Sequence, residues 1–144
     1  MKRYVRFCFV ALVAVFLSSG SVAAGDISDA DSARIQSVIL SQLDAFKADD
    51  AAAAFARAAP TIQRKFGTPD VFLNMVRTAY APVYRPRYVE FAALAVDGKD
   101  VVQHAIIEGQ DGSVVMAVYP MVQDDQGQWL IAGCYIQQLE RKST

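Results

Sequence analysis

Three side chains in the C-terminal half of the sequence could carry out chemistry if the fold brought them together. His104 is the only histidine of the chain, and Tyr119 and Cys134 lie in later apolar runs. An imidazole can serve as a general base and a thiol as a nucleophile. An isomerase- or lyase-type enzyme that uses His104 and Tyr119, with Cys134 as a further catalytic candidate, is therefore one interpretation. In the other, which we favour, His104 and Tyr119 are hydrogen-bonded core residues and Cys134 is a small buried hydrophobe.

A second set of polar residues lies in the stretch RTAYAPVYRPRYV, residues 77–89. Guanidinium groups suit planar anionic partners, so Arg77, Arg85 and Arg87 could capture an anionic group at the mouth of a pocket. They could instead hold the ends of helices and strands together through carboxylates and backbone carbonyls. We favour this second interpretation, because surface arginines are commonly only solvated or weakly paired. The residues predicted to bind a ligand, if one enters the fold, are Tyr84, Arg85, Arg87, His104 and Tyr119.

The sequence contains no pattern typical of a metal site or a phosphate-binding cofactor. It has no glycine-rich phosphate loop, no nucleophile elbow and no closely spaced set of histidines, cysteines and carboxylates. We therefore expect no cofactor and no metal. The formal net charge of −1, which becomes −4 without residues 1–24, also argues against broad nucleic-acid binding, which depends on clustered lysines and arginines.

The N-terminus has the features of a secretory signal peptide. Three basic residues among the first six precede the apolar run FCFVALVAVFL, and small residues at 22–24 fit the cleavage pattern. An uncleaved anchor is the alternative, but no basic stop-transfer segment follows the run, which is shorter than the roughly 20 residues of a membrane span. We expect a signal peptide at 1–24. The mature protein would start near Gly25, be periplasmic or secreted, and keep no membrane contact after cleavage.

Residues 25–144 are expected to form a single α+β domain, with helices at about 31–80 and strands at about 87–139. Cleavage removes three cations and no acid, so the formal net charge changes from −1 to −4. Cys134 is then the only cysteine left. It is either buried and free or paired with another molecule.

The first two expected helices differ in character. Apolar residues recur every three or four positions from Ile35 to Phe46, which is typical of one buried stripe on a helix. A short alanine-rich helix follows, with Asp50 as its cap. It is expected to stop at Pro60.

The third expected helix has clear boundaries. Thr68 as the cap and Pro69 at the first helical position predict its start, and it should end near Tyr80. Pro82 and Pro86 each remove a backbone donor and disfavour helix in the residue before them. We therefore expect an extended crossing from this helix into the first strand.

From Tyr88 onward, apolar and polar residues alternate as they do in half-buried strands. Four such runs, separated by DGKD, EGQDG and QDDQGQ, predict an antiparallel four-stranded meander. We assume two-residue loops at 98–99 and 111–112 and an even-numbered loop around Gln126. A bulge at Pro120 would change part of this register. Under these assumptions one face carries Phe91, His104, Ile106, Ala117, Tyr119, Met121, Ala132, Cys134 and Ile136.

The opposite face of the predicted sheet is also apolar toward its C-terminal strands. One layer of helices covers only one face, and an exposed apolar face suggests a partner. We therefore expect a homodimer that packs through the outer sheet face. The residues expected in this contact are Met116, Val118, Ile131 and Tyr135.

Three segments resemble an uncharacterised bacterial domain-of-unknown-function family (number 4864) with a nuclear-transport-factor-2-like, or cystatin-like, fold. They are FKADDAAAAFARAAP, FGTPDVFLNMVRTAYAPVYRPRYVEF and YPMVQDDQGQWLIAGCYI, and the resemblance extends from about Ala33 to Leu139. It implies N-terminal helices packed on a curved four-stranded antiparallel sheet, and it implies no reaction. Isomerase-like members of the wider superfamily use an Asp base and an oxyanion hole of Tyr and a protonated acid. No carboxylate accompanies His104 and Tyr119 on the predicted inner face, so that arrangement is not matched.

Together these observations predict an exported, non-catalytic domain. It would bind a small, largely apolar ligand in a cone between helices and sheet, or act as an interaction module. The alternative is the isomerase- or lyase-type enzyme that uses His104 and Tyr119.

Overall fold

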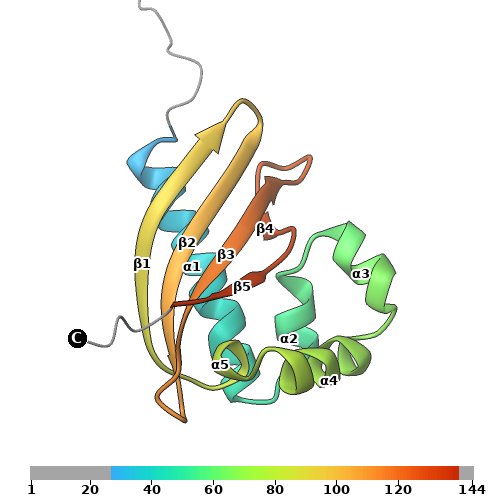
Figure 1. The fold of residues 1–144 in the computed structure, drawn as a ribbon. Helices are drawn as coiled ribbons and strands as arrows, with labels where there is room; N and C mark the ends of the chain where they lie inside the picture. The colour runs from blue at the N-terminus through green and yellow to red at the C-terminus, as the bar shows by residue number, and fades with distance from the viewer. Residues whose placement is uncertain (1–26, 140–144) are drawn as a thin grey trace, which may run out of the picture.

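The structure is a computed structural model that describes residues 27–139. It has the expected α+β architecture, with helices in the N-terminal half and an open antiparallel sheet in the C-terminal half (Figure 1). The helices are α1 (Asp29–Lys47), α2 (Ala51–Ala56), α3 (Pro60–Phe66), α4 (Pro69–Ala79) and α5 (Ala81–Tyr84). The strands are β1 (Pro86–Asp97), β2 (Asp100–Gly109), β3 (Val114–Gln123), β4 (Trp129–Ile131) and β5 (Tyr135–Gln138).

The long helix α1 forms the main layer over the sheet, and it lies behind the strands in Figure 1. Ser28 caps its start by accepting a hydrogen bond from the Asp31 backbone N–H at 3.0 Å. The Asp31 carboxylate in turn accepts a hydrogen bond from Trp129 Nε1 of β4 at 3.1 Å. This contact ties the start of α1 to the end of the sheet. The predicted apolar stripe of α1 is buried in the core at Ile35, Ile39, Leu43 and Phe46.

Pro60 begins a helix that the sequence analysis missed. The short helix α2 is capped as predicted, because the Asp50 carboxylate accepts a hydrogen bond from the Ala53 N–H at 3.0 Å. After it, Ala59 N–H donates to the Ile131 carbonyl at 2.8 Å, which joins this segment to β4. Pro60 then occupies the first turn of α3, where its missing N–H costs no hydrogen bond.

The expected extended crossing between the last helix and the first strand is wrong in part. Helix α4 starts with Thr68 as its cap, as predicted. Beyond Tyr80, however, the chain forms the one-turn helix α5, in which Tyr84 N–H donates to the Tyr80 carbonyl at 2.9 Å. Pro82 lies in the first turn of α5, where no donor is required. Pro86 begins β1, so a single residue, Arg85, separates the two elements.

The sheet has the strand order β1-β2-β3-β4, and β5 also pairs with β3. The first hairpin has the predicted two-residue loop, since Asp97 pairs with Asp100. An irregularity in β1 then separates Phe91 from Leu94. The buried Gln103 amide donates to the Ala92 carbonyl at 3.1 Å, so the buried side chain of β2 satisfies a backbone acceptor of this irregular stretch.

The two later hairpins have a register that differs from the predicted one. Gly109 bonds to Ser113 and Asp124 bonds to Gln128, so each turn has three central residues instead of an even number. The last central residue of each, Gly112 and Gly127, has a positive φ of 77° and 76°, the conformation that such a loop requires at this position. A loop with an odd number of residues shifts the following strand by one residue relative to the predicted pairing. Such a shift exchanges the residues on the two faces of that strand.

The shift moves His104 away from Tyr119, contrary to the prediction. His104 pairs with Val118, and Tyr119 pairs with Gln103. His104 and Ile106 therefore lie on the outer face of the sheet, whereas Tyr119 lies under the helices. The buried inner face carries Val101, Gln103, Ala105, Ile107, Val115, Ala117, Tyr119, Met121, Trp129 and Ile131.

The closing strand is interrupted opposite Pro120, the position at which a bulge was considered as an alternative to the assumed register. Met121 pairs with Ile131 of β4, and Val118 pairs with Tyr135 of β5, so the closing strand has one more residue than β3 over this interval. The Pro120 carbonyl still accepts a hydrogen bond from the Ala132 N–H at 2.8 Å. Since proline has no N–H to return this bond, the ladder breaks and the register changes.

The predicted signal peptide, residues 1–24, lies outside the described residues, so cleavage and export stay predictions. Within residues 27–139, none of the helices combines the length and the apolar character that a membrane crossing requires.

The homodimer also stays a prediction, but one of the residues expected in its contact does not lie on the outer face. Ile131 faces the helices and is buried, so it does not belong to the outer contact. Met116, Val118 and Tyr135 do lie on the outer face. We expect the wild type to sediment as a dimer and Val118→Glu to weaken association by roughly a hundredfold or more, because a buried unpaired charge is costly.

Val71→Glu is the matched control for this experiment. It adds the same charge on α4 at a valine that is 52% exposed, and it should leave the sedimentation of the dimer unchanged. A wild type that sediments as a monomer at micromolar concentration would show that the outer face has no self-association role.

Candidate functional site

A pocket of about 440 Å³ lies between the helices α3–α5 and the interrupted closing strand. In Figure 1, α3 and α4 stand beside the edge of the sheet that carries β4 and β5. The break between β4 and β5 contributes Ala132, Gly133 and Cys134 to one wall, and α4 contributes the other. The apolar residues that line the pocket are Phe46, Ala58, Ile62, Phe66, Phe72, Met75, Val76, Ala79, Val83 and Ile131.

Aromatic rings form part of the wall. The Phe72 ring on α4 is the centre of a cluster, with ring centroids 5.9 Å from Phe46, 5.5 Å from Phe55 and 5.5 Å from Phe66. All the pairs are tilted, which is a favourable arrangement for aromatic rings. Since Phe46, Phe66 and Phe72 also line the pocket, three helices fix the positions of its rings.

The wall near the strand break carries hydroxyl and thiol groups. Burial raises the pKa of Cys134 to about 12, and burial also raises the pKa of Tyr80, with smaller effects of Cys134 and Tyr135. Behind Cys134, the Tyr119 hydroxyl is fully buried, and its pKa is raised well above the ordinary value by burial and by the nearby thiol. These groups are therefore protonated and uncharged at neutral pH.

Tyr119 and Cys134 lie together as predicted, whereas the predicted position of His104 beside them is wrong. The Tyr119 hydroxyl lies next to the Cys134 thiol, although within the described residues it makes no hydrogen bond of good geometry. His104 lies on the other face, with its Nδ1 3.1 Å from the Ala93 carbonyl oxygen. The odd loop between β2 and β3 is the physical cause of this difference.

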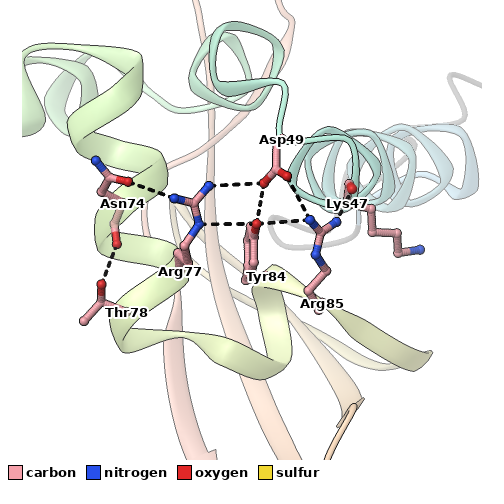
Figure 2. Close-up of polar contacts among 7 residues, drawn as sticks. All are labelled: Lys47, Asp49, Asn74, Arg77, Thr78, Tyr84 and Arg85. Carbon is pink, nitrogen blue, oxygen red and sulfur yellow. Dashed lines mark hydrogen bonds and ion pairs between the residues drawn. The ribbon is translucent and has the colours of Figure 1, made fainter.

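The arginines of residues 77–89 do not form an open anion site among the described contacts. Figure 2 shows Arg77 and Arg85 pointing toward Asp49, at the end of α1. Arg77 Nη2 lies 3.3 Å and Arg85 Nη2 lies 3.0 Å from the Asp49 carboxylate, and the Tyr84 hydroxyl donates to the same carboxylate. Arg87 pairs with Glu108 instead. The favoured interpretation, in which the arginines join the ends of elements, describes these contacts.

The Asp49 cluster, defined as Asp49, Arg77, Tyr84 and Arg85, supports the pocket from outside. Arg85 also donates to the Lys47 carbonyl, one of the last carbonyls of α1. Asp49 itself has a positive φ of 53°, a conformation that aspartate tolerates better than most residues. Since the pocket residues Tyr80 and Val83 lie between Arg77 and Tyr84 in the chain, the cluster fixes the α4–α5 corner that forms the wall.

The predicted ligand-binding residues are distributed over separate parts of the structure. Tyr84 and Arg85 belong to the Asp49 cluster, Arg87 pairs with Glu108, His104 is on the outer face, and Tyr119 is buried behind Cys134. Whether any of them binds a ligand stays a prediction. Within residues 27–139, no group of three or more histidines, cysteines or carboxylates could hold a metal ion.

Most of the pocket was not predicted from the sequence. Lys65 and Ile62 lie on α3, which was not predicted, and Tyr80 was treated only as the end of a helix. Pro60 was the sequence feature that could have predicted α3, because proline is common at the first position of a helix. A helix placed there would have brought Ile62, Lys65 and Phe66 opposite α4.

Comparisons with known proteins identify a family and no relative of known activity. The model of the family described as "Domain of unknown function (DUF4864)" matches residues 28–144. No curated protein and no solved structure gives a significant match.

The raised pKa of Cys134 predicts a slow reaction with iodoacetamide. At about pH 8, a thiol with a pKa of about 12 has roughly a thousandfold less thiolate than one with the ordinary value of 9.0. We expect alkylation of the folded protein, followed by intact-mass measurement, to be slower than that of the urea-unfolded protein by at least about a hundredfold. Equal rates would show that the thiol is neither buried nor shifted.

The Asp49 cluster predicts acid sensitivity. The hydrogen bond from Tyr84, and then the two arginines, hold the pKa of Asp49 below its ordinary value of 3.8. The stabilisation is therefore present above the unfolded value and is lost as pH falls through the lower folded pKa. We expect Asp49→Asn to lower the melting temperature at neutral pH and to flatten its decline below about pH 4.

Asp125→Asn is the control for this measurement, because Asp125 lies in an exposed turn. Its melting temperature should follow that of the wild type throughout the titration. If Asp49→Asn had the same acid dependence as the wild type, the carboxylate would not be a link between α1 and α4–α5.

Proposed function

The chain belongs to the DUF4864 family, whose description assigns no reaction, and on that premise we propose that it is a binding protein for a small, largely apolar molecule. The ligand would occupy the pocket between α3–α5 and the β4–β5 break. The domain is proposed to act after export, as the N-terminal sequence predicts.

The observation that carries this proposal is the combination of size and wall chemistry in one pocket. Its volume of about 440 Å³ falls within the range of about 300–1,000 Å³ that is typical of small-molecule sites. The wall is mainly apolar and aromatic, with a few polar groups. Such a composition favours a ligand that buries apolar surface and makes few directional contacts.

Two features support binding over the isomerase or lyase alternative. The thiol and hydroxyl groups near the pocket are protonated at neutral pH, because burial raises the pKa of Cys134 and Tyr80. They are therefore poor bases and poor nucleophiles. Among the residues that line the pocket, there is no histidine and no carboxylate to act as a general base.

A substitution that fills the pocket tests the proposal. Ala79 lines the pocket from an exposed position on α4, so Ala79→Trp can place an indole in the space without displacing the core. We expect the wild type to enhance the fluorescence of the neutral apolar probe N-phenylnaphthylamine, and we expect Ala79→Trp to weaken this binding by about tenfold or more.

Two control variants are measured with the same fluorescent probe. Val71→Trp adds the same side chain to α4 at a residue that does not line the pocket, and His104→Ala alters the outer face of the sheet. Both should bind the probe as the wild type does. A wild type that does not bind the probe would refute the proposal, and so would an Ala79→Trp variant that keeps full affinity while it remains folded by circular dichroism.

A further inference from the structure

We infer that the ligand of this pocket is an amphipathic molecule with a single anionic head group, which binds at Lys65 while the apolar part enters between α4 and the β4–β5 break. This inference rests on the proposed function and adds the charge and the orientation of the ligand. It depends on the distribution of charge around the pocket.

Lys65 is the one residue with a charged side chain among those that line the pocket. It lies in the last turn of α3, and its side chain is accessible to solvent. Within residues 27–139 it forms no ion pair. The ammonium group is therefore not neutralised by a described carboxylate, and its charge acts on the mouth of the pocket.

The ammonium group of Lys65 lies close to an aromatic ring of the pocket wall. Its Nζ lies 5.5 Å from the centroid of the Phe66 ring, and Phe66 also lines the pocket. An ammonium over an aromatic face is attracted by the ring, and the lysine stem covers apolar surface. The wall itself thus holds the cation at the rim instead of leaving it to extend into water.

The three arginines of residues 77–89 are already compensated by carboxylates. Arg77 and Arg85 share the Asp49 carboxylate, and Arg87 pairs with Glu108. An anion that approached them would compete with an existing partner. Lys65 has no such competitor among the described residues, so it is the better anion site, although the sequence analysis did not select it.

The remaining polar groups of the wall do not oppose a negative ligand. Tyr80 and Cys134 are neutral at physiological pH, because burial raises the pKa of both groups. None of the described residues that line the pocket carries a carboxylate. A cationic ligand would therefore meet only repulsion from Lys65, a neutral ligand would gain nothing from it, and a carboxylate would gain an ion pair at the rim.

A matched set of ligands tests this inference in the full chain. Decanoate, decanol and decyltrimethylammonium share one alkyl chain and differ in the charge of the head, and each can displace N-phenylnaphthylamine at neutral pH. For the wild type we expect decanoate to bind about fivefold tighter than decanol, as for an exposed ion pair at the upper end of the usual range. Decyltrimethylammonium should bind more weakly than decanol, and high salt should reduce the differences.

The variant Lys65→Met removes the charge and keeps a flexible apolar stem. It should bind decanol as the wild type does and should lose the preference for decanoate. Arg64→Met, which removes the neighbouring charge of α3 at a residue that does not line the pocket, should keep the preference.

The outcomes separate this inference from the proposed function. If the probe binds but the wild type does not prefer decanoate, the pocket is a neutral apolar site and the inference is wrong. It is also wrong if Lys65→Met keeps the preference, because the head must then contact another group. If neither the probe nor any of the alkyl ligands binds, the proposed function itself fails.

Discussion

Pro120 imposes the constraint on which the site depends. Its carbonyl accepts a hydrogen bond from Ala132, but it has no N–H to return that bond, so β3 cannot pair continuously with the closing strand. One extra residue is accommodated there, and Ile131 bonds on its other side to Arg57 and Ala59. The strand break therefore creates one wall of the pocket and, through Ile131, also positions the segment that leads into α3.

Helix α1 connects this strand break to the opposite wall. Near its start, the Asp31 carboxylate accepts a hydrogen bond from Trp129 of β4, and beyond its end Asp49 binds Arg77, Tyr84 and Arg85. The apolar stripe between these ends is buried in the core. The ion pairs at Asp49 are exposed and individually weak, and the part-buried Trp129 contact is a single hydrogen bond. The burial of α1 therefore supplies most of the stabilisation, and the contacts set the orientation of the walls.

Features set by local chemistry could be predicted from the sequence, and features set by the length of a loop could not. The cap at Thr68 and the two-residue turn between Asp97 and Asp100 follow from local residue types and were predicted, and Pro120 was named as a place where a bulge would change the register. The three-residue loops that end in Gly112 and Gly127 use the same turn residues as two-residue loops. Alternation fixes which residues share a face within a strand, but it does not fix which face is buried, so His104 was placed on the wrong side.

The two three-residue loops have a consequence for how the chain can change in length. Adding or removing one residue in either loop would reverse the inward and outward sides of every strand that follows, up to the next irregularity. Two residues at a time would leave the sides unchanged. A one-residue change balanced by the loss of the extra residue opposite Pro120 would restore the sides of β5 only, and β4 would stay reversed. Length variation among members of this family is therefore expected in even steps at these turns.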